Sequence, residues 1–311
     1  MPVLQAAYCH AGIKLGKASL KGKVKACPVC GSLKNKKTGV IQENPDVWLM
    51  ECPGCRAVYV SRMPSASALK KYYKSYYRDK KQAHSGPGVT MQSSKRFARR
   101  IFRAYNPGGR KREVSILDFG GGNGAVAAEI GRLFVEEKGF IKAGVTVIDE
   151  SRVKCAACAK GVSMKSRAGL KNLKNRKFDI VIASAVLEHL PDPMGALRKL
   201  AAAVRPGGIF YARTSYVVPL MKALKVLGIK MDFGFPAHLY DFGREFWENA
   251  VEMLPGKKRY RIITAGPSMA ESSFRAHFFR TIAAYVLKFP WYFFRKSYGL
   301  VGAWEVIIAK K

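Results

Sequence analysis

The stretch ILDFGGGNGAVAAEI, Ile116 to Ile130, places four glycines within five positions, between an apolar run and a helix-like run. Glycine adopts positive φ angles and lets the backbone approach a ligand without a Cβ in the way. The helix that follows would offer its first N–H groups to the same ligand. The stretch therefore predicts a nucleotide-like cofactor, although Gly120, Gly122 and Ala125 also fit the GxGxxG/A pattern of dinucleotide dehydrogenases.

Strand-like and helix-like runs alternate around this loop. Short apolar runs at 115–120, 144–149, 178–184 and 207–214 are separated by helical segments, and 304–311 reads as a late strand at or near the sheet edge. This alternation predicts an α/β fold with a parallel sheet and crossover helices. Upstream, a basic helix is expected over 69–82, a linker over 85–90, and an amphipathic helix over 93–105 with Phe97, Ile101 and Phe102 on one side.

Two CxxC pairs lie near the N-terminus. Cys27 and Cys30 in CPVC are separated by 21 residues from Cys52 and Cys55 in CPGC. Four thiolates in two such turns complete a tetrahedral shell suited to Zn²⁺, with no position left for a reactive water, so the pattern predicts a structural zinc.

A third CxxC motif, Cys155 to Cys158, has no second pair beside it. We interpret these two cysteines as small buried side chains in an alanine-rich helical segment rather than as metal ligands.

The charge balance is strongly basic. The chain has 55 Lys+Arg against 21 Asp+Glu, a formal net charge of +34, which attracts nucleic acid, acidic membrane surfaces or phosphorylated small molecules. The basic residues are spread from end to end, which disfavours an RNA-binding stripe. No apolar run approaches the roughly 18 residues of a membrane span and the start lacks a signal-peptide core, so we expect a cytoplasmic protein. Peripheral contact with the inner face of the membrane stays an alternative.

Two aromatic and apolar tracts, 216–240 and 274–300, are interrupted by Pro, Gly and Lys. Packed helices, a substrate lid and a surface that rests on a membrane all fit this composition. Ordinary core packing is the commonest of these explanations.

Two acids favour one cofactor class over the other. Asp118 stands two residues before the first glycine, where an acid suits a cofactor with an ammonium and a sulfonium group, and Asp149 can accept hydrogen bonds from ribose hydroxyls. The successive motifs DFGGGNG, VIDES, FDIVIASAVLEHLPDP and VRPGGIF resemble those of class I S-adenosylmethionine-dependent methyltransferases, over Ile116 to Thr214.

The outer segments CPVCGS, CPGCRAVYVSRMPSASALKKYY, PAHLYDFGREFWENA and VGAWEVIIAKK resemble the zinc-ribbon methyltransferases that modify sugars and glycan precursors in bacteria. The resemblance implies an α/β, Rossmann-like class I methyltransferase sheet with helices on both faces, preceded by a small zinc ribbon, with substrate held between the two. The expected parts are an N-terminal arm and ribbon at 1–75, a helical connector at 76–112 and a methyltransferase domain with substrate-covering insertions at 113–311. The implied cofactor residues are Asp118, Gly120, Gly122 and Gly124 at the methionine end, Asp149 at the ribose and Ser184 near the methyl donor.

The candidate catalytic residues follow the fourth strand. His189, in LEHLPDP, lies where open α/β sheets place their ligands and is the first candidate for a general base. Glu188, His238 and Tyr240 are further candidates by resemblance. The alternative for His189 and Glu188 is a capping or structural role, and for His238 and Tyr240 it is to anchor a loop to the sheet.

Three functions follow from these patterns. The leading one is methylation of an anionic small molecule, a nucleotide sugar or a lipid-linked glycan precursor, with S-adenosylmethionine as cofactor. The alternative enzyme is an RNA methyltransferase that uses the basic surface to bind rRNA or tRNA. A nucleic-acid or membrane-binding module with an inactive methyltransferase fold is the third, and the intact glycine set with Asp118 and Asp149 argues against it.

Overall fold

The computed structural model of the chain describes residues 3–5, 13–79, 94–108, 112–150, 156–167, 169–173, 176–268, 274, 278–295 and 298–311. The predicted linker at 85–90 and Cys155 lie outside these residues. Cys158 is described, and it is exposed in a stretch, 156–159, that is not helical. The prediction of a buried helical side chain at Cys158 was therefore wrong, because small apolar residues alone do not pack a segment against the core.

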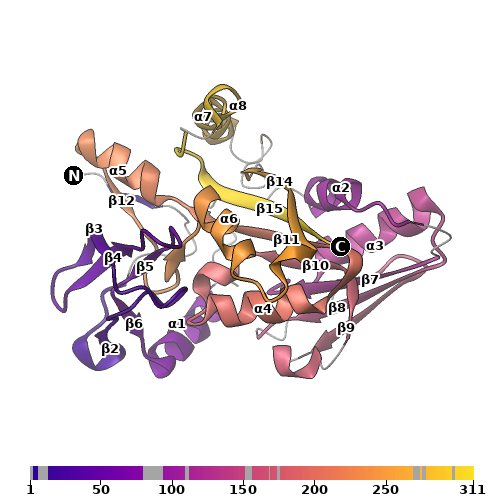
Figure 1. Ribbon diagram of the computed structural model, residues 1–311, viewed down its shortest axis with the longest axis horizontal. Helices are drawn as coiled ribbons and strands as arrows, with labels where there is room; N and C mark the ends of the chain where they lie inside the picture. The colour runs from indigo at the N-terminus through magenta and orange to yellow at the C-terminus, as the bar shows by residue number, and fades with distance from the viewer. Residues whose placement is uncertain are drawn as a thin grey trace.

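A seven-stranded sheet with the order β14-β15-β11-β10-β7-β8-β9 forms the centre of the molecule (Figure 1). The strands from β9 to β11 are parallel, and β15 runs antiparallel to both of its neighbours. Chain order reverses between β7 and β10, which is the point where open α/β sheets bind ligands. The strands are β7 (Glu113–Phe119), β8 (Lys142–Ile148), β9 (Val162–Arg167), β10 (Phe178–Ser184), β11 (Val204–Tyr216), β14 (Tyr260–Pro267) and β15 (Gly302–Lys310).

Helices cover both faces of this sheet, as predicted. Along β10, Ile180 and Ile182 pack in a cluster with α2 (Ser94–Ala104) and α3 (Ala125–Lys138). Val181 and Ala183 pack in the other cluster, with α4 (Pro193–Ala203) and α6 (Arg244–Glu252). Successive side chains of a strand point to opposite faces, so an uninterrupted apolar run is what a strand buried on both faces requires. The structure confirms the Rossmann-like class I methyltransferase fold.

The two helices predicted between the ribbon and the main sheet are present, although the first begins three residues earlier than predicted and residues 80–82 lie outside the described part of the chain. Helix α1 spans Ala66–Asp79, and α2 buries Phe97, Ile101 and Phe102 at 6%, 0% and 6% exposure. Strands β9 and β14 were not predicted, because both carry polar and exposed residues in place of a continuous apolar run.

The cysteine-bearing segment forms a second sheet that includes a strand from the C-terminal half. Its order is β13-β5-β4-β3, with β13 (Tyr240–Asp241), β5 (Val58–Val60), β4 (Val47–Glu51) and β3 (Lys36–Gln42). Two small pairs join β2 (Leu20–Lys23) to β6 (Arg62–Pro64), and β1 (Val3–Gln5) to β12 (Lys230–Asp232). Because β13 completes the ribbon sheet, the ribbon and the segment after β11 fold against each other and share one core.

The remaining helices lie after β11 and between the last two strands. Helix α5 spans Val218–Val226, while α7 (Phe278–Lys288) and α8 (Trp291–Phe294) connect β14 to β15 and stand above the sheet in Figure 1. Short 3-10 turns span Lys17–Ser19 (η1), Leu170–Leu173 (η3), Leu187–His189 (η4) and Lys257–Arg259 (η5). In the described part of the chain, every helix is too short or too polar to cross a bilayer.

Candidate active site

Three glycines after β7 adopt left-handed backbone conformations. The φ angles are +72° at Gly120, +57° at Gly122 and +74° at Gly124, a region that residues with a Cβ rarely occupy. The Gly120 amide donates to the carbonyl oxygen of Ile148 at 2.8 Å, which ties the loop to the end of β8. Gly124 immediately precedes α3. The predicted glycine set therefore forms one turn from the carboxyl edge of the sheet into a helix N-terminus.

Asp118 is an acid buried beneath this turn. Its exposure is 3%, and burial, with the nearby charge of Asp149, raises the pKa of Asp118 to about 7. Within the described residues, Asp118 forms no ion pair. A buried carboxylate without a cation is costly, so this position suits a ligand that brings a positive charge.

Gly121 is a site residue that the sequence pattern did not single out. A Cβ at Gly121 would lie 2.3 Å from the carboxyl carbon of Asp118. No real Cβ makes a contact that short, so the close approach of Asp118 requires glycine here. The signal in the sequence was the unbroken triplet Gly120 to Gly122, of which the cofactor pattern uses only the first and last.

Asp149 follows β8 and holds the loop from the other side. Its Oδ2 accepts a hydrogen bond from the Gly122 amide at 2.8 Å. A carboxylate has about four acceptor sites, so Asp149 can bind the loop and accept from ribose hydroxyls at once.

Ser184 ends β10 and contacts a residue that the sequence analysis missed. The Nε of Arg213 donates to the Ser184 Oγ at 3.2 Å, and the two residues are paired in register across β10 and β11. Arg213 is 8% exposed. The sequence did offer a signal for Arg213, because it is a cation near the end of the apolar run GGIFYART. An arginine buried in such a strand needs polar partners nearby.

The segment after β10 packs directly against the glycine loop. A Cβ at Gly120 would lie 2.7 Å from the Cγ2 of Val186, and Glu188 and His189 follow in η4. The fold therefore brings the predicted cofactor loop and the predicted catalytic residues together at one edge of the sheet.

His189 and His238 form a pair at this edge. Their ring centroids are 4.8 Å apart. Nδ1 of His189 lies 3.0 Å from the carbonyl oxygen of Ala237, and Nδ1 of His238 lies 3.0 Å from that of Phe233. A carbonyl oxygen only accepts, so each Nδ1 carries a proton and each Nε2 has the lone pair when the ring is neutral. Burial lowers the pKa of both rings to about 4, which keeps both neutral near pH 7.

Glu188 completes the cluster. It is 2% exposed, and its Oε1 accepts from the Ser215 amide at 3.1 Å. Its Oε2 is buried and has no hydrogen-bond partner among the residues that the structure describes. Burial raises the pKa of Glu188. One ligand atom from each of Glu188, His189 and His238 lies within 4.8 Å of the others, so the cluster has both a proton acceptor and a donor set that suits a divalent cation.

Tyr240 lies in the core beside this cluster. It is 0% exposed, stacks on Phe242 with ring centroids 5.2 Å apart, and donates its hydroxyl to the carbonyl oxygen of Pro191 at 3.1 Å. This geometry favours the predicted alternative, a loop anchor. We therefore leave Tyr240 out of the proposed catalytic set.

The rest of the LEHLPDP motif starts a helix. Asp192 is the N-cap of α4, its Oδ1 accepts from the Gly195 amide at 2.8 Å, and Pro193 occupies the first turn. Aspartate at N-cap and proline at N1 are the residues that a helix start favours. Of this motif, Glu188 and His189 therefore stay candidate site residues, while Asp192 and Pro193 have a structural role at the start of α4.

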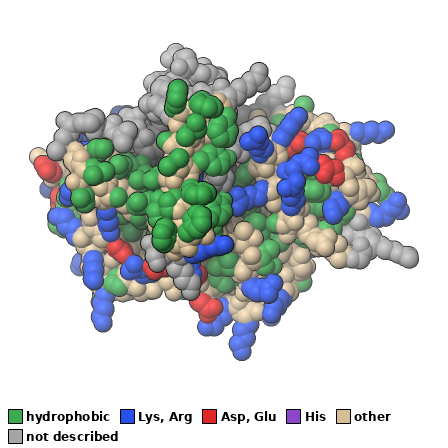
Figure 2. Space-filling model, turned by 90° about the horizontal axis from the view of Figure 1, so that it is seen from above, with side chains coloured by type: hydrophobic (Ala, Val, Ile, Leu, Met, Phe, Trp, Pro, Cys, Tyr) green, Lys and Arg blue, Asp and Glu red, His purple; other side chains and the backbone are tan. Residues whose placement is uncertain are grey.

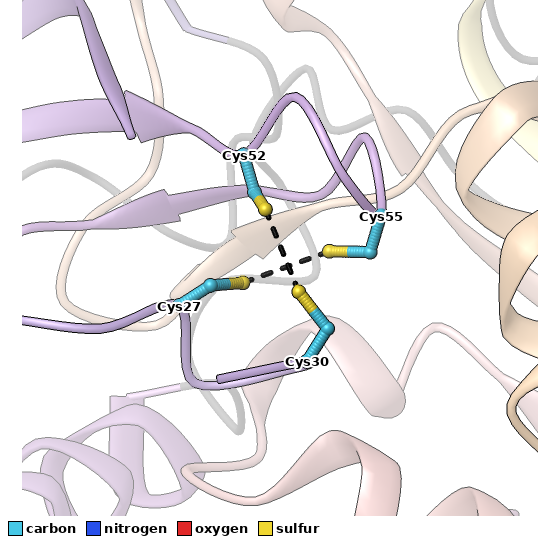
Figure 3. Close-up of side chains that lie close together, drawn as sticks. All are labelled: Cys27, Cys30, Cys52 and Cys55. Atoms are coloured by element: carbon cyan, nitrogen blue, oxygen red, sulfur yellow. Dashed lines mark hydrogen bonds between the residues drawn. The ribbon is translucent and has the colours of Figure 1, made fainter. Parts of the chain in front are cut away.

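The four cysteine thiols of the ribbon converge on one point (Figure 3). The sulfurs of Cys27 and Cys55 are 3.6 Å apart, those of Cys30 and Cys52 are 3.5 Å apart, and all four lie within 4.8 Å of one another. Sulfurs at the corners of a tetrahedron with Zn–S bonds of about 2.3 Å are about 3.8 Å apart. The donor set and its spacing therefore fit a closed tetrahedral zinc site.

The two cysteine turns have the same backbone geometry. The amide of Gly31 donates to the Cys27 carbonyl and that of Arg56 to the Cys52 carbonyl, both at 2.8 Å. Gly31 and Arg56 have φ angles of +77° and +61°. Each turn therefore aims both of its thiols at the same side, which brings four ligands to one centre.

The family model that matches this chain is described as a methyltransferase domain and spans residues 90–265. This range includes more than half of the 311 residues and both the glycine loop and the histidine pair. The chain belongs to this methyltransferase domain family.

Curated relatives match over part of their length. The ubiquinone biosynthesis O-methyltransferase of Colwellia psychrerythraea is 30% identical over 130 residues, 39% of this chain and 52% of that protein. The protein of the same name from Methylobacterium nodulans is 30% identical over 165 residues, 51% of this chain and 62% of that protein. The chain thus spans less than two thirds of these relatives. Among solved structures, magnesium protoporphyrin IX methyltransferase from Synechocystis PCC 6803 with bound SAH has a TM-score of 0.46 and 14% identity, covering 79% of this chain and 99% of that chain.

Proposed function

We propose that the protein is an S-adenosylmethionine-dependent methyltransferase that methylates a hydroxyl oxygen of a small molecule. The observation that carries the proposal is the contact between the glycine loop and the segment that carries Glu188 and His189, made where Gly120 meets Val186. It joins a binding site for a cationic cofactor to a neutral base. Membership of the methyltransferase domain family supports the same reaction class.

The loop residues fit S-adenosylmethionine. Asp118 would face its positively charged methionine end, the amides of the glycine turn and the start of α3 would contact it, and Asp149 would accept from its ribose. The bound cofactor supplies a methyl group on a sulfonium. The protein's own task is to align the acceptor oxygen and exclude water, and such positioning contributes at most roughly 7–11 kcal/mol.

His189 is the proposed base. Its Nδ1–H is directed to the Ala237 carbonyl, so its Nε2 is the atom that would take the proton of the acceptor hydroxyl. The partly exposed His189 is the member of the pair nearer to solvent, and His238 is buried behind it. We propose that His238 and Glu188 orient His189 and stabilise the imidazolium that proton transfer produces.

For the acceptor we propose only the kind of atom that is methylated and the class of molecule that carries it. The two relatives carry the name O-methyltransferase, which supports oxygen as the atom methylated. The comparisons give no support to the expected nucleotide-sugar or glycan-precursor substrate, so the proposal is limited to a hydroxylated small molecule.

We also propose that the ribbon binds a structural Zn²⁺ through Cys27, Cys30, Cys52 and Cys55. The ribbon sheet contains β13, which begins two residues after His238. A rigid ribbon would therefore hold the loop that carries His238 in place.

The test is methyl transfer from radiolabelled S-adenosylmethionine into a nuclease-treated and an untreated host lysate, followed by separation into lipid, small-molecule, RNA and protein fractions. Label in the lipid or small-molecule fraction, on an oxygen in the purified product, is the expected result. Label that nuclease treatment removes would contradict the proposal and support the RNA alternative.

A further inference from the structure

Helix α7 presents an apolar face to solvent. Exposure is 83% at Phe279, 39% at Ile282 and 66% at Val286, and it is 60% at Phe289, which directly follows α7 and whose amide still donates to the Tyr285 carbonyl. Spacings of three, four and three residues place these side chains along one side of a helix. Ordinary core packing, the commonest expectation for this tract, is therefore wrong for α7.

Two polar residues of α7, Thr281 and Lys288, face inward. Thr281 is 1% exposed and Lys288 is 3% exposed, and they lie seven residues apart on the side opposite to the apolar face. The Lys288 Nζ donates to the carbonyl oxygen of Ser268 at 2.6 Å. A surface helix of a protein in water has the reverse arrangement, so α7 is oriented for an apolar neighbour on its outer side.

Helix α8 extends this surface and fixes it to the sheet. Phe293 and Phe294 are 69% and 64% exposed. Trp291 points the other way: its ring lies 6.0 Å from that of Trp304 in β15, and a Cβ at Gly266 would lie 3.2 Å from it. We call Phe279, Ile282, Val286, Phe289, Phe293 and Phe294 the α7–α8 surface.

The charge around this surface has one sign. Between Phe274 and Tyr298 the sequence has five Lys and Arg residues and no acidic residue, within a chain of net charge +34. Of these cations, Lys288 is buried and does not border the surface. Arg295 is exposed and its guanidinium lies 4.9 Å from the Trp291 ring centroid. Figure 2 looks onto the side where α7 and α8 stand, and shows hydrophobic side chains gathered there with Lys and Arg beside them.

These features together indicate what the α7–α8 surface binds. Exposed Phe side chains beside Arg295, in a strongly basic chain, match an anionic lipid surface, whose headgroups attract Lys and Arg while its interface accepts aromatic side chains. With 11 residues, α7 cannot span a bilayer. We propose that the protein docks on anionic membranes through the α7–α8 surface, with α7 lying in the plane of the interface.

The surface lies at the edge of the sheet that carries the candidate active site. It connects the end of β14 to the start of β15, and Gly302 at that start is paired with Tyr216 at the carboxyl end of β11. Docking would therefore hold this edge of the sheet close to the membrane. The inference depends on the α7–α8 surface alone and not on the proposed reaction.

The experiment is flotation of the purified full chain with vesicles of phosphatidylcholine alone or with phosphatidylglycerol added. Wild type is expected to float with the anionic vesicles and to lose this binding in high salt. Phe279→Glu and Val286→Glu should each weaken binding about tenfold or more, since burying one large apolar side chain contributes roughly that much. Leu33→Glu is the matched control, because Leu33 is a 77% exposed apolar residue on the ribbon and gives the same change in charge.

Several results would overturn the proposal. These are failure of wild type to float with anionic vesicles, equal binding of Phe279→Glu and wild type, or an equal loss in Leu33→Glu. Light scattering of the same proteins tests whether the surface instead binds a second copy of the chain. A wild-type dimer that Phe279→Glu dissociates would assign the surface to that contact. Cofactor binding by each variant shows that the protein is folded and leaves the proposed function to its own test.

Discussion

The rings of His189 and His238 lie 4.8 Å apart, and each directs its Nδ1 proton to a backbone carbonyl oxygen. Two neutral imidazoles in a fixed orientation stand beside the buried carboxyl group of Glu188. Backbone carbonyls cannot change their role, so the tautomer is set by the fold. Each neutral ring can therefore accept a proton only at Nε2, the nitrogen that faces away from the carbonyl oxygen.

This pair makes the protein sensitive to acid. Both folded-state pKa values, about 4, lie below the ordinary 6.5 of histidine, so the unfolded chain binds more protons between pH 6.5 and pH 4. The contribution of the two neutral rings to the free energy of unfolding is complete above pH 6.5. It is lost as pH falls toward 4, by on the order of 1–3 kcal/mol per ring. In urea unfolding at pH 7 and pH 5, His238→Gln should lose less stability on acidification than wild type. Equal losses would show that His238 does not titrate differently in the folded state.

Asp118 should control cofactor affinity. Its pKa of about 7 means that wild type should bind S-adenosylmethionine more tightly as pH rises from 6 to 8 and the carboxyl group ionises. Asp118→Asn should lack this rise and bind roughly 10- to 150-fold more weakly, because a charged hydrogen-bond partner contributes about 1.5–3 kcal/mol. Calorimetric titration measures both effects.

The stability of the same variant provides the control for Asp118. Folding raises the pKa of Asp118 above its unfolded value of about 3.9, so the folded protein loses stability as pH rises from about 4 to about 7, and the loss is essentially complete at pH 8. Cofactor-free Asp118→Asn should therefore be at least as stable as wild type at pH 8. A large drop in its melting temperature would mean that Asp118 has a structural role instead.

Gly121→Ala tests the close contact beneath the loop. The new methyl group would need the space of the Asp118 carboxyl group, so the loop or Asp118 must move and cofactor affinity should fall at least tenfold, the effect of about 1.4 kcal/mol. Gly144→Ala in β8 is the control, because its Cβ would meet nothing closer than 4.0 Å. Similar affinities for the two variants would contradict the geometry of the loop.

Metal analysis tests the ribbon. Wild type should contain one zinc per chain, and Cys30→Ser should lose it together with thermal stability, because three thiolates no longer close the tetrahedral shell. Cys158→Ser changes an exposed cysteine outside the ribbon and should alter neither property. Full zinc retention in Cys30→Ser would show that Cys30 is not a zinc ligand.

The fold was predictable from the sequence wherever a residue's role is local. The apolar run of β10 is uninterrupted because both faces of the strand are buried, and the glycines of the loop are needed for its positive φ angles. Both features can therefore be recognised from a few consecutive residues. Likewise, each CxxC turn aims its own two thiols. The edge strands β9 and β14 have no such pattern, since each has three exposed residues along its length.

The parts of the site that the sequence did not reveal depend on pairing between distant segments. Arg213 meets Ser184 only because β10 and β11 are neighbours in register, and the Tyr240 hydroxyl donates to the carbonyl oxygen of Pro191, 49 positions away. The outward face of α7 was equally hidden, because an apolar helical pattern does not state which side faces the protein. Such facts follow from tertiary packing and need the structure.

The most direct test of the proposed function compares wild type, His189→Ala and Tyr240→Phe in one methyl-transfer assay at saturating S-adenosylmethionine. Wild type should transfer label to a hydroxylated small molecule, His189→Ala should be slower by roughly 10²–10⁴ with unchanged cofactor binding, and Tyr240→Phe should stay close to wild type. Turnover of His189→Ala at the wild-type rate, or no transfer by a wild type that binds the cofactor, would contradict the account.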